Sequence, residues 1–371
     1  SIMQIINTKE QKFITWLAIS IALGWWSKYS VLFMAMAIVI GLILSPYRNV
    51  FTKKKTWLAV LLAMVIILPN LHWQYSHNWP LVHHMEELRD TQLKYINKSD
   101  FIKDQFMMLI PAILLWMAGL VWVLRQKQWR IIGVIYFSVI LLLLFGSGKS
   151  YYTLGAYPVL IAAGSVLWEQ MLNKRKWIGY SLAMLMVLFN WMIMPLLLPI
   201  WTPDKLDAFY KKTGIEHKWE DLKAHPLPQD FADMLGWKEL TERTENFFNS
   251  LPDSIKVNTT IYGANYGQAG AMKFYGQNDL FKNSVISENG SFQLWINDHL
   301  FFKHLIIVDD EVPDPDDEVI RHFEKISLID SVRNKYSRQL GDKIFFLQSL
   351  DSTGLRLAQE GFIENKKRFN R

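Results

Sequence analysis

Long apolar stretches separated by short polar segments fill the first 200 residues of the chain. A helix needs about 20 apolar residues to cross the hydrocarbon core of a bilayer. Seven stretches reach or approach that length: 12–26, 29–46, 56–73, 104–124, 130–147, 151–171 and 177–200. Because a helix satisfies its own backbone polar groups in lipid, we expect about seven transmembrane helices within residues 1–201.

Beyond Trp201 the pattern is that of a soluble domain. Residues 231–251 have the spacing of one amphipathic helix, and NYGQAGAMKFYG predicts another helix after a glycine-bearing turn. The runs KVNTTIYGA, HLIIVDD and KIFFLQSL predict strands. The fold class is therefore a multi-pass α-helical membrane domain followed by a small α/β domain with a partly parallel sheet over 202–350. Residues 351–371 are expected to form a tail with a disordered end.

Composition and charge narrow the functional classes. The chain is 51% hydrophobic with a net charge of +6, and its basic residues gather in short loops between apolar runs. That placement is typical of membrane topology, so we do not expect a nucleic-acid partner. The absence of cysteine excludes disulfides, a thiol nucleophile and cysteine-ligated metals.

Three basic loops set the predicted orientation. YRNVFTKKK (47–55), RQKQWR (125–130) and NKRK (173–176) are separated by even numbers of spans, and the positive-inside rule places all three in the cytoplasm. The amino-terminal end of the chain then also lies in the cytoplasm. The turn at Lys28, the loop 74–103, the turn at Lys149 and everything after residue 201 lie outside.

Two of these external turns carry a lysine beside tyrosines: Lys28 with Tyr29, and Lys149 with Tyr151 and Tyr152. Lysine supplies a compact positive charge, and tyrosine supplies a hydroxyl donor on an apolar body. Such residues at the membrane surface could receive a lipid-linked phosphate. Alternatively, the lysines snorkel and the tyrosines form an aromatic belt.

The external loop from 79 to 95 has the apolar spacing of an amphipathic helix lying in the membrane interface. It lies in a region rich in titratable side chains: His72, His77, His83, His84, Glu86, Glu87 and Arg89. His83 and Glu87 share a helix face and could hold a divalent ion, but no third ligand stands at motif spacing. The loop could instead bind an anionic sugar donor, transfer protons, or be an ordinary surface helix.

The α/β domain offers one weaker candidate site. Asn265, Tyr266 and Gln268 follow a predicted strand and could contact an acceptor glycan or peptide, or simply form a turn. The glycines here lack GxGxxG spacing, so nucleotide binding is not expected. The acidic segment 309–318 lacks EF-hand spacing and is interpreted as a solvated loop.

Four segments occur in an order that resembles a known family: ALGWWSKYSVLF, LPNLHWQYSHNWPLVHH, GKSYYTLGAYPVL and YGANYGQAGAMKFYG. Over about residues 24–350 the chain resembles bacterial members of glycosyltransferase family 39, which are related to protein O-mannosyltransferases and to the lipid A aminoarabinose transferase. The resemblance implies a GT-C fold and a polyprenyl-phosphate-linked sugar donor. It also implies that Lys28, Tyr29, the 79–89 loop and the 149–152 turn border that donor.

The sequence departs from the family in one respect. The family's catalytic Asp or Glu lies in the first external loop, whereas the turn GWWS here carries no carboxylate. We therefore expect the catalytic residue upstream of Ser1, in helices missing from an amino-terminally truncated chain.

The expected function is sugar transfer from the polyprenyl phosphate to an extracytoplasmic protein or glycolipid. We expect this reaction in a bacterial inner membrane, with the α/β domain in the periplasm. The alternative is a non-catalytic membrane scaffold whose external domain binds a glycan or a partner. A transporter is disfavoured because no charged residue lies deep within a predicted span.

Overall fold

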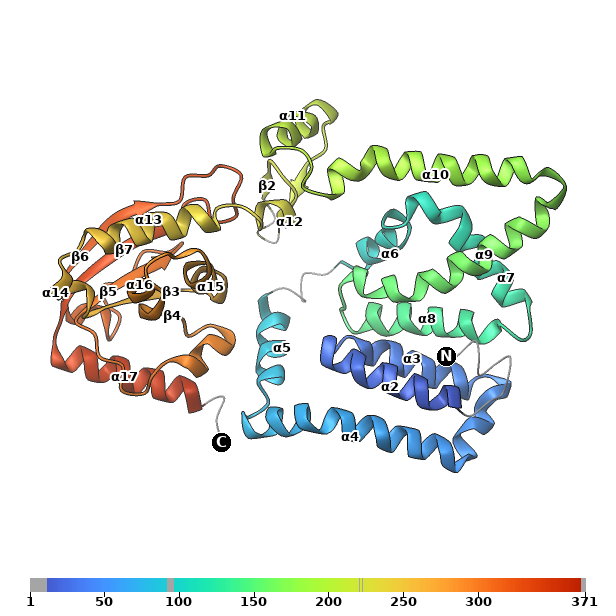
Figure 1. Ribbon diagram of the computed structural model, residues 1–371, viewed down its shortest axis with the longest axis horizontal. Helices are drawn as coiled ribbons and strands as arrows, with labels where there is room; N and C mark the ends of the chain where they lie inside the picture. Colours follow the sequence, from blue (N-terminus) through green and yellow to red (C-terminus); the bar gives the residue numbers. More distant parts are fainter. Residues whose placement is uncertain (1–11, 92–96, 220, 222, 368–371) are drawn as a thin grey trace. The chain divides into compact units, whose positions relative to one another are not determined.

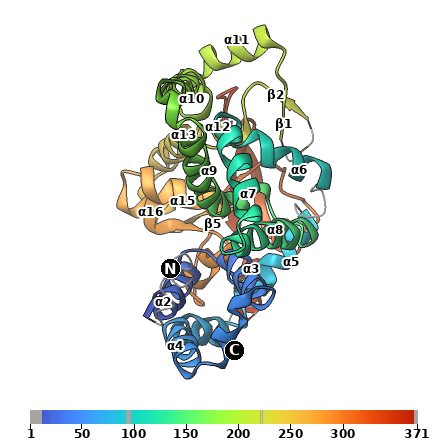
Figure 2. The ribbon, with the colours of Figure 1, turned by 90° about the vertical axis from the view of Figure 1, so that its right-hand side faces the viewer.

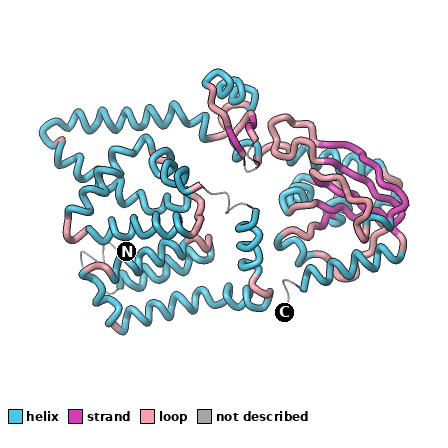
Figure 3. Tube along the Cα trace, turned by 180° about the vertical axis from the view of Figure 1, so that it is seen from behind, coloured by secondary structure: helices cyan, strands magenta, loops and turns pink. Residues whose placement is uncertain are grey.

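The computed structural model describes residues 12–91, 97–219, 221 and 223–367. The chain divides into two compact units, Ser1–Tyr75 with Leu81–Pro195 and Ser76–Pro80 with Leu196–Arg371. We call them the membrane unit and the α/β unit. The membrane unit is helical, and the strands lie in the α/β unit (Figure 3).

Each of the seven predicted apolar stretches contains a helix. The helices are α2 (Lys12–Ser27), α3 (Val31–Ile43), α4 (Lys54–Ser76), α5 (Pro80–Thr91), α6 (Lys98–Met107), α7 (Ile113–Arg125), α8 (Arg130–Phe145), α9 (Tyr157–Met171) and α10 (Lys176–Leu197). Short 3-10 segments connect them: η1 (Pro46–Thr52), η3 (Ile110–Ala112), η4 (Ser150–Ala156) and η5 (Asn173–Arg175).

The expectation of seven spans is not confirmed. Within the described residues, only Lys54–Ser76 and Asn173–Leu197 are long and apolar enough to cross a membrane as single helices. Two bent pairs raise the total to four: Val31–Ile43 with Pro46–Thr52, and Lys98–Met107 with Ile110–Arg125.

Helix breaks and helix length account for the difference. Pro46 opens η1 after a bend of 107°, and Pro111 lies in η3 at a bend of 62°. Proline lacks the N–H group that a continuing helix needs, so these apolar runs do not form straight helices. The helix α8 has 16 residues, or about 24 Å at 1.5 Å per residue, which is less than the roughly 30 Å hydrocarbon core.

Glycines allow the closest helix contacts of the membrane unit. A methyl group added at Gly119 of α7 would lie 1.8 Å from the carbonyl oxygen of Leu160 in α9. A methyl group at Gly164 of α9 would lie 1.9 Å from the carbonyl oxygen of Leu115. The helices α7 and α9 lie side by side (Figure 2), so their backbones touch where a side chain would separate them.

A second close contact joins α3 to α8. A methyl group at Gly41 would lie 2.5 Å from Cγ1 of Ile135. Ala37, Leu143 and Leu160 are fully buried in the shared core of α3, α8 and α9. Small residues at helix crossings are typical of membrane helix packing, because lipid chains are as apolar as the side chains they would displace.

The α/β unit is built on a five-stranded sheet. Its helices are α11 (Pro203–Thr213), α12 (Gln229–Ala232), α13 (Trp237–Ser250), α14 (Asp253–Lys256), α15 (Tyr266–Tyr275), α16 (Asp279–Ser284) and α17 (Ser352–Lys367), with the 3-10 segments η6 (Gly290–Trp295) and η7 (Ile320–His322). The sheet strands are β3 (Thr259–Gly263), β4 (Val285–Ile286), β5 (His304–Asp309), β6 (Phe323–Ser331) and β7 (Lys343–Leu350). The short strands β1 (His217–Lys218) and β2 (Ala224–His225) pair separately.

The sheet is partly parallel, as the alternation of strands and helices predicts. Its order is β4-β3-β5-β7-β6; β3 runs parallel to β4 and β5, and β7 runs antiparallel to β5 and β6. Alternate residues of β5 face opposite layers. Ile306 and Val308 join the core under α13 and α15, and Leu305 and Ile307 join the core under α17 (Figure 1).

The structure corrects two local predictions. Residues 352–367, expected in a tail, form α17, because Leu355, Ala358 and Phe362 make an apolar stripe that packs on the sheet. Residues 368–371 lie outside the described part. The helix predicted over 231–251 is broken, because Gly236 at φ 86° separates α12 from α13.

The contact between α7 and α9 generates a stability prediction. Gly119→Ala is expected to lower the melting temperature of the full chain in detergent, because the new methyl group must push the two backbones apart at a cost of roughly 1–3 kcal/mol. The matched control is Gly179→Ala in α10, where the nearest atom would lie 3.7 Å from the added carbon. Equal melting temperatures for the two variants would contradict the close contact.

Candidate functional site

Lys28 lies in the turn between α2 and α3, as predicted. The turn is shorter than predicted, because the residues GWWS belong to the last turn of α2. The Nζ atom of Lys28 lies 4.7 Å from the ring centroid of Tyr152 and 5.3 Å from that of Tyr151. We call these three residues the lysine–tyrosine cluster. A cation over an aromatic face gains about 0.5–2 kcal/mol. Among the described residues, Lys28 has no carboxylate partner within 4 Å.

The two tyrosines follow the turn between α8 and α9. Ser147 takes a left-handed conformation with φ 52°, and the backbone N–H of Gly148 donates to the carbonyl oxygen of Leu143 at 2.8 Å. Lys149 occupies the N-cap position of η4, and its side chain makes no capping hydrogen bond. Burial raises the pKa of the Tyr152 hydroxyl, and Lys28 and Lys149 both lie near enough to lower it. Tyr152 is therefore a common neighbour of two lysines that are far apart in the sequence.

Tyr29 connects the Lys28 turn to α4. Its hydroxyl donates to Oδ1 of Asn70 at 3.1 Å and accepts from Nε2 of Gln74 at 2.9 Å. Trp25 also donates to Oδ1 of Asn70, at 2.8 Å. Tyr29 thus uses its hydroxyl to position the turn. Sequence reasoning missed Asn70 and Gln74, although two amides near the end of an apolar stretch were a detectable signal.

Asp104 and Gln105 of α6 hold η4 in place. Ser150 donates to Oδ2 of Asp104 at 2.7 Å. Thr153 and Tyr157 donate to Oε1 of Gln105 at 2.7 and 2.8 Å, and Gln105 is 3% exposed. Sequence reasoning also missed this pair, because it opens the apolar run 104–124; the polar dipeptide there was the available signal.

The helix α5 forms most of the segment 79–95, which is predicted to be an interfacial helix. The apolar side chains of Trp79, Val82 and Met85 are exposed there, as an interfacial helix requires. The backbone N–H of Leu81 donates to Oε1 of Gln74 at 3.2 Å, which connects α5 to the hydrogen bonds of Tyr29. Residues 92–96 of this segment lie outside the described part.

The titratable residues of α5 do not form a metal site among the described residues. Nδ1 of His83 lies 3.8 Å from Oε2 of Glu86. The side chain of Glu87, the predicted partner of His83, lies outside the described residues. No group of three or more His, Cys, Asp or Glu that could hold a metal occurs in the described part of the chain. Contacts of His84 and Arg89 with a donor stay predictions.

In the α/β unit, the three predicted acceptor residues differ in their surroundings. Asn265 and Gln268 form a capping box at the start of α15, in which each side chain accepts from the other residue's backbone N–H. Gln268 is buried and donates to Oδ2 of Asp342 at 2.8 Å. Tyr266 is 62% exposed. The capping box therefore occupies two of the side chains and leaves the Tyr266 ring accessible to an acceptor.

Asp342 has an unusual electrostatic environment beside this capping box. The pKa of Asp342 is raised to about 6: burial raises it most, the hydrogen bond from Gln268 lowers it, and the negative charges of Asp310 and Asp309 raise it. Burial and the neighbouring Asp310 also raise the pKa of Asp309. At the end of β5 the acidic segment therefore begins with one partly buried carboxyl group, that of Asp309, followed by the exposed Asp310.

The hydrogen bonds of Gln105 can be tested by Gln105→Leu. This change removes Oε1, the acceptor that Thr153 and Tyr157 share. Thr153 keeps its bond to the carbonyl oxygen of Ser150, whereas Tyr157 keeps only longer contacts of 3.3 and 3.4 Å. Losing a good hydrogen bond of a buried group costs about 1–3 kcal/mol. We expect a lower melting temperature for the full chain in detergent. Gln170→Leu, at an exposed position of α9, is the control. A melting temperature at the control value would mean that these bonds do not stabilise η4.

The buried carboxyl group of Asp342 predicts a pH-dependent effect. The folded state binds this proton more tightly than the unfolded chain does. The stability contributed by Asp342 is therefore full below its ordinary pKa and is lost as the pH rises through about 6. Asp342→Asn removes the buried charge and should stabilise the α/β unit at pH 7.5 by roughly 1–3 kcal/mol, with a much smaller effect near pH 4.

Amide hydrogen exchange in β7, corrected for intrinsic rates, measures this stability locally in the full chain. Asp316→Asn, at an exposed position of the acidic segment, is the control and should change exchange little at either pH. An equal effect of Asp342→Asn at both pH values would show that its charge is not the cause.

A comparison with known protein families gives a match that lies within the membrane unit. Residues 2–73 match the family model described as dolichyl-phosphate-mannose-protein mannosyltransferase. No match was found among curated proteins or among solved structures. The matched segment contains Lys28, Tyr29 and Asn70, whereas the 149–152 turn lies beyond it. Together with the apolar helices, the match confirms the resemblance to the mannosyltransferase family within residues 2–73. The bacterial assignment and the resemblance beyond residue 73 stay predictions. Through residues 2–73, the chain is similar to the dolichyl-phosphate-mannose-protein mannosyltransferases, a family of membrane glycosyltransferases.

Proposed function

We propose that the chain binds a polyprenyl-phosphate-linked sugar at the lysine–tyrosine cluster and takes part in its transfer to an extracytoplasmic acceptor. One observation carries the proposal: the Lys28 ammonium group lies over the rings of Tyr151 and Tyr152. These two tyrosines follow Lys149 and Ser150 in the chain. Two cations and two phenol hydroxyls thereby meet at the membrane surface, next to helices of a glycosyltransferase-like segment.

The chemistry of the transfer explains the need for these groups. When the sugar leaves its carrier, negative charge grows on the lipid phosphate. Preorganised cations and hydrogen-bond donors lower the barrier by stabilising that charge. Lys28 and Lys149 supply the positive charge, and the hydroxyls of Tyr151 and Tyr152 supply donors. Arg89, His83, His84 and Glu86 of α5 are proposed to border the sugar.

The acceptor side of the proposed reaction lies at Tyr266. Tyr266 presents an exposed ring at the start of α15, where it could stack against an acceptor glycan or peptide. Activating an acceptor hydroxyl needs a general base, and the lysine–tyrosine cluster contains no carboxylate to supply it.

The proposed location follows the basic loops. We place the chain in a bacterial inner membrane with loops 47–55, 125–130 and 173–176 in the cytoplasm and the α/β unit in the periplasm. The lysine–tyrosine cluster then faces the periplasm. The alternative of a non-catalytic scaffold is not favoured by the family match.

Binding of a polyprenyl phosphate tests the donor site without requiring a known acceptor. Lys28→Ala and Lys149→Ala should each raise the dissociation constant about tenfold or more, because each removes a charge-assisted contact worth roughly 1.5–3 kcal/mol. The measurement is a titration of the purified full chain in detergent. Lys103→Ala is the control, since Lys103 is exposed and pairs with Asp100 at 3.1 Å.

The same titration separates the two interpretations of the lysines. If they only snorkel to the membrane surface, Lys28→Ala and Lys149→Ala will bind the phosphate as tightly as the wild type and the Lys103→Ala control. That outcome would overturn the donor-site proposal.

A further inference from the structure

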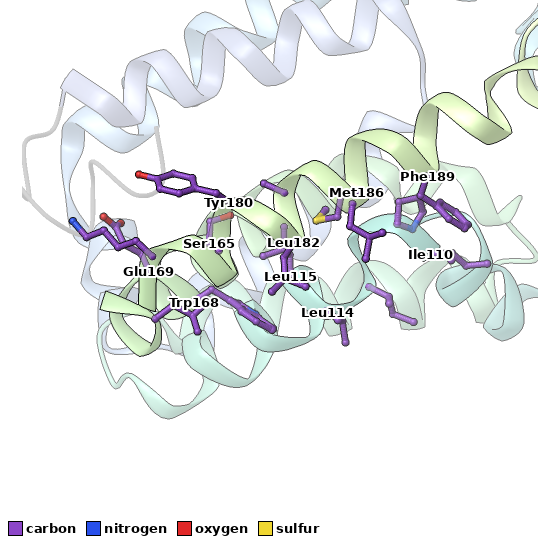
Figure 4. Close-up of a pocket in the computed structure, with 17 residues that line it drawn as sticks. Ile110, Leu114, Leu115, Ser165, Trp168, Glu169, Tyr180, Leu182, Met186 and Phe189 are labelled. Carbon is purple, nitrogen blue, oxygen red and sulfur yellow. The ribbon is translucent and has the colours of Figure 1, made fainter. Parts of the chain in front are cut away.

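The helix α10 stands apart from the packed core of the membrane unit. None of its residues is buried, although it is apolar over most of its 22 residues. A groove of about 580 Å³ separates it from α7 and α9 (Figure 4). This volume lies within the usual range of ligand pockets, about 300–1,000 Å³. An apolar occupant would gain dispersion contacts with the mainly apolar side chains of the groove walls.

Most of the groove is lined by apolar side chains. Leu114 and Leu115 come from α7, and Leu182, Met186 and Phe189 come from α10 (Figure 4). The α10 residues are spaced by about one helical turn, so they form one continuous apolar wall. This wall suits a long, flexible hydrocarbon chain rather than a compact polar ligand.

One end of the groove is polar. Ser165 and Glu169 are one turn apart on α9, and Tyr180 faces them from α10 (Figure 4). Lys176 also lines the groove and lies four residues before Tyr180, on the same helix face. The opposite end, at Ile110 and Phe189, lacks charged side chains among the lining residues. The groove therefore has an apolar body and a mouth with one positive and one negative charge.

We propose that this groove binds one bilayer phospholipid with an ethanolamine headgroup. An acyl chain lies along the apolar wall, Lys176 contacts the lipid phosphate, and Glu169 accepts hydrogen bonds from the ammonium group. The bound lipid fills the space between α10 and the core. This site is separate from the lysine–tyrosine cluster, so it does not depend on the proposed sugar transfer.

The two charges at the mouth select the headgroup. A carboxylate accepts hydrogen bonds from a primary ammonium group, whereas the quaternary ammonium of choline has no N–H to donate. Glycerol carries no positive charge to pair with Glu169. The expected order of affinity is therefore ethanolamine, then choline, then glycerol headgroups on the same acyl chains.

Native mass spectrometry of the delipidated full chain in detergent tests this site, with the three phospholipids added separately. We expect one phosphatidylethanolamine to bind about tenfold more tightly than phosphatidylcholine. Glu169→Gln should reduce that preference to less than about threefold, and Lys176→Ala should weaken the binding of both lipids about tenfold. Lys174→Ala, in the basic segment 173–176 but outside the groove lining, should change neither the headgroup preference nor the affinity for either lipid.

A groove-filling pair of variants tests the position of the acyl chain. Ala183→Trp places a large side chain in the groove, whereas Met184→Trp adds the same group at an exposed position outside the lining. We expect lipid binding to be lost in the first variant and kept in the second. If Ala183→Trp does not fold, the exposed substitutions at Glu169 and Lys176 still decide the question.

Three results would overturn the proposal. Equal affinities of the wild type for the three headgroups would refute the role of Glu169 and Lys176. Unchanged lipid binding in Ala183→Trp would place the lipid elsewhere. Competition by a polyprenyl phosphate for the same site would make the groove part of the donor site. Because the donor titration uses Lys28→Ala and Lys149→Ala, failure of either proposal leaves the other testable.

Discussion

The contact between the backbones of α7 and α9 positions most of the membrane unit. Glycine in a helix interior costs about 1 kcal/mol relative to alanine, and lipid supplies little hydrophobic force for helix association. Gly119 and Gly164 offset that cost because, without side chains, they let the two backbones pack directly against each other, at the carbonyl oxygens of Leu160 and Leu115. Because α9 follows η4 and α7 follows α6 and η3, the contact also brings η4 to α6. Gln105 can then accept from both Thr153 and Tyr157.

The contact between α3 and α8 completes the candidate site. Gly41 allows α3 to approach Ile135 of α8, and Lys28 lies just before α3 while the tyrosines follow α8. Docking these helices therefore places the Lys28 ammonium over the rings of Tyr151 and Tyr152. The hydrogen bonds of Tyr29 to α4 and of Ser150 to Asp104 hold the two turns in place. The lysine–tyrosine cluster is thus positioned by small residues within the helices.

The sequence predicts single residues of this site better than it predicts their contacts. Lys28, Tyr151 and Tyr152 were identifiable because charges and phenols interrupt apolar runs, but their meeting depends on a helix crossing that hydropathy does not encode. Apolar length likewise predicted the helices and overestimated the number of membrane spans, because it ignores the bends at η1 and η3.

In the α/β unit, β5 and β7 are continuous apolar runs and were predicted. The edge strand β6 has a single buried residue among nine, and β4 has two residues, so neither carried a signal. The N-x-x-Q spacing of Asn265 and Gln268 is a capping signature that a functional interpretation overlooked.

The aromatic partners of Lys28 have a consequence for its chemistry. A carboxylate at that position would neutralise the ammonium group and compete with any anionic ligand. Tyrosine rings orient the ammonium group through their quadrupoles without cancelling its charge. Lys149 acts on the same Tyr152. In the proposed donor site, the aromatic rings therefore fix the position of the Lys28 ammonium group and leave its charge for an anionic ligand.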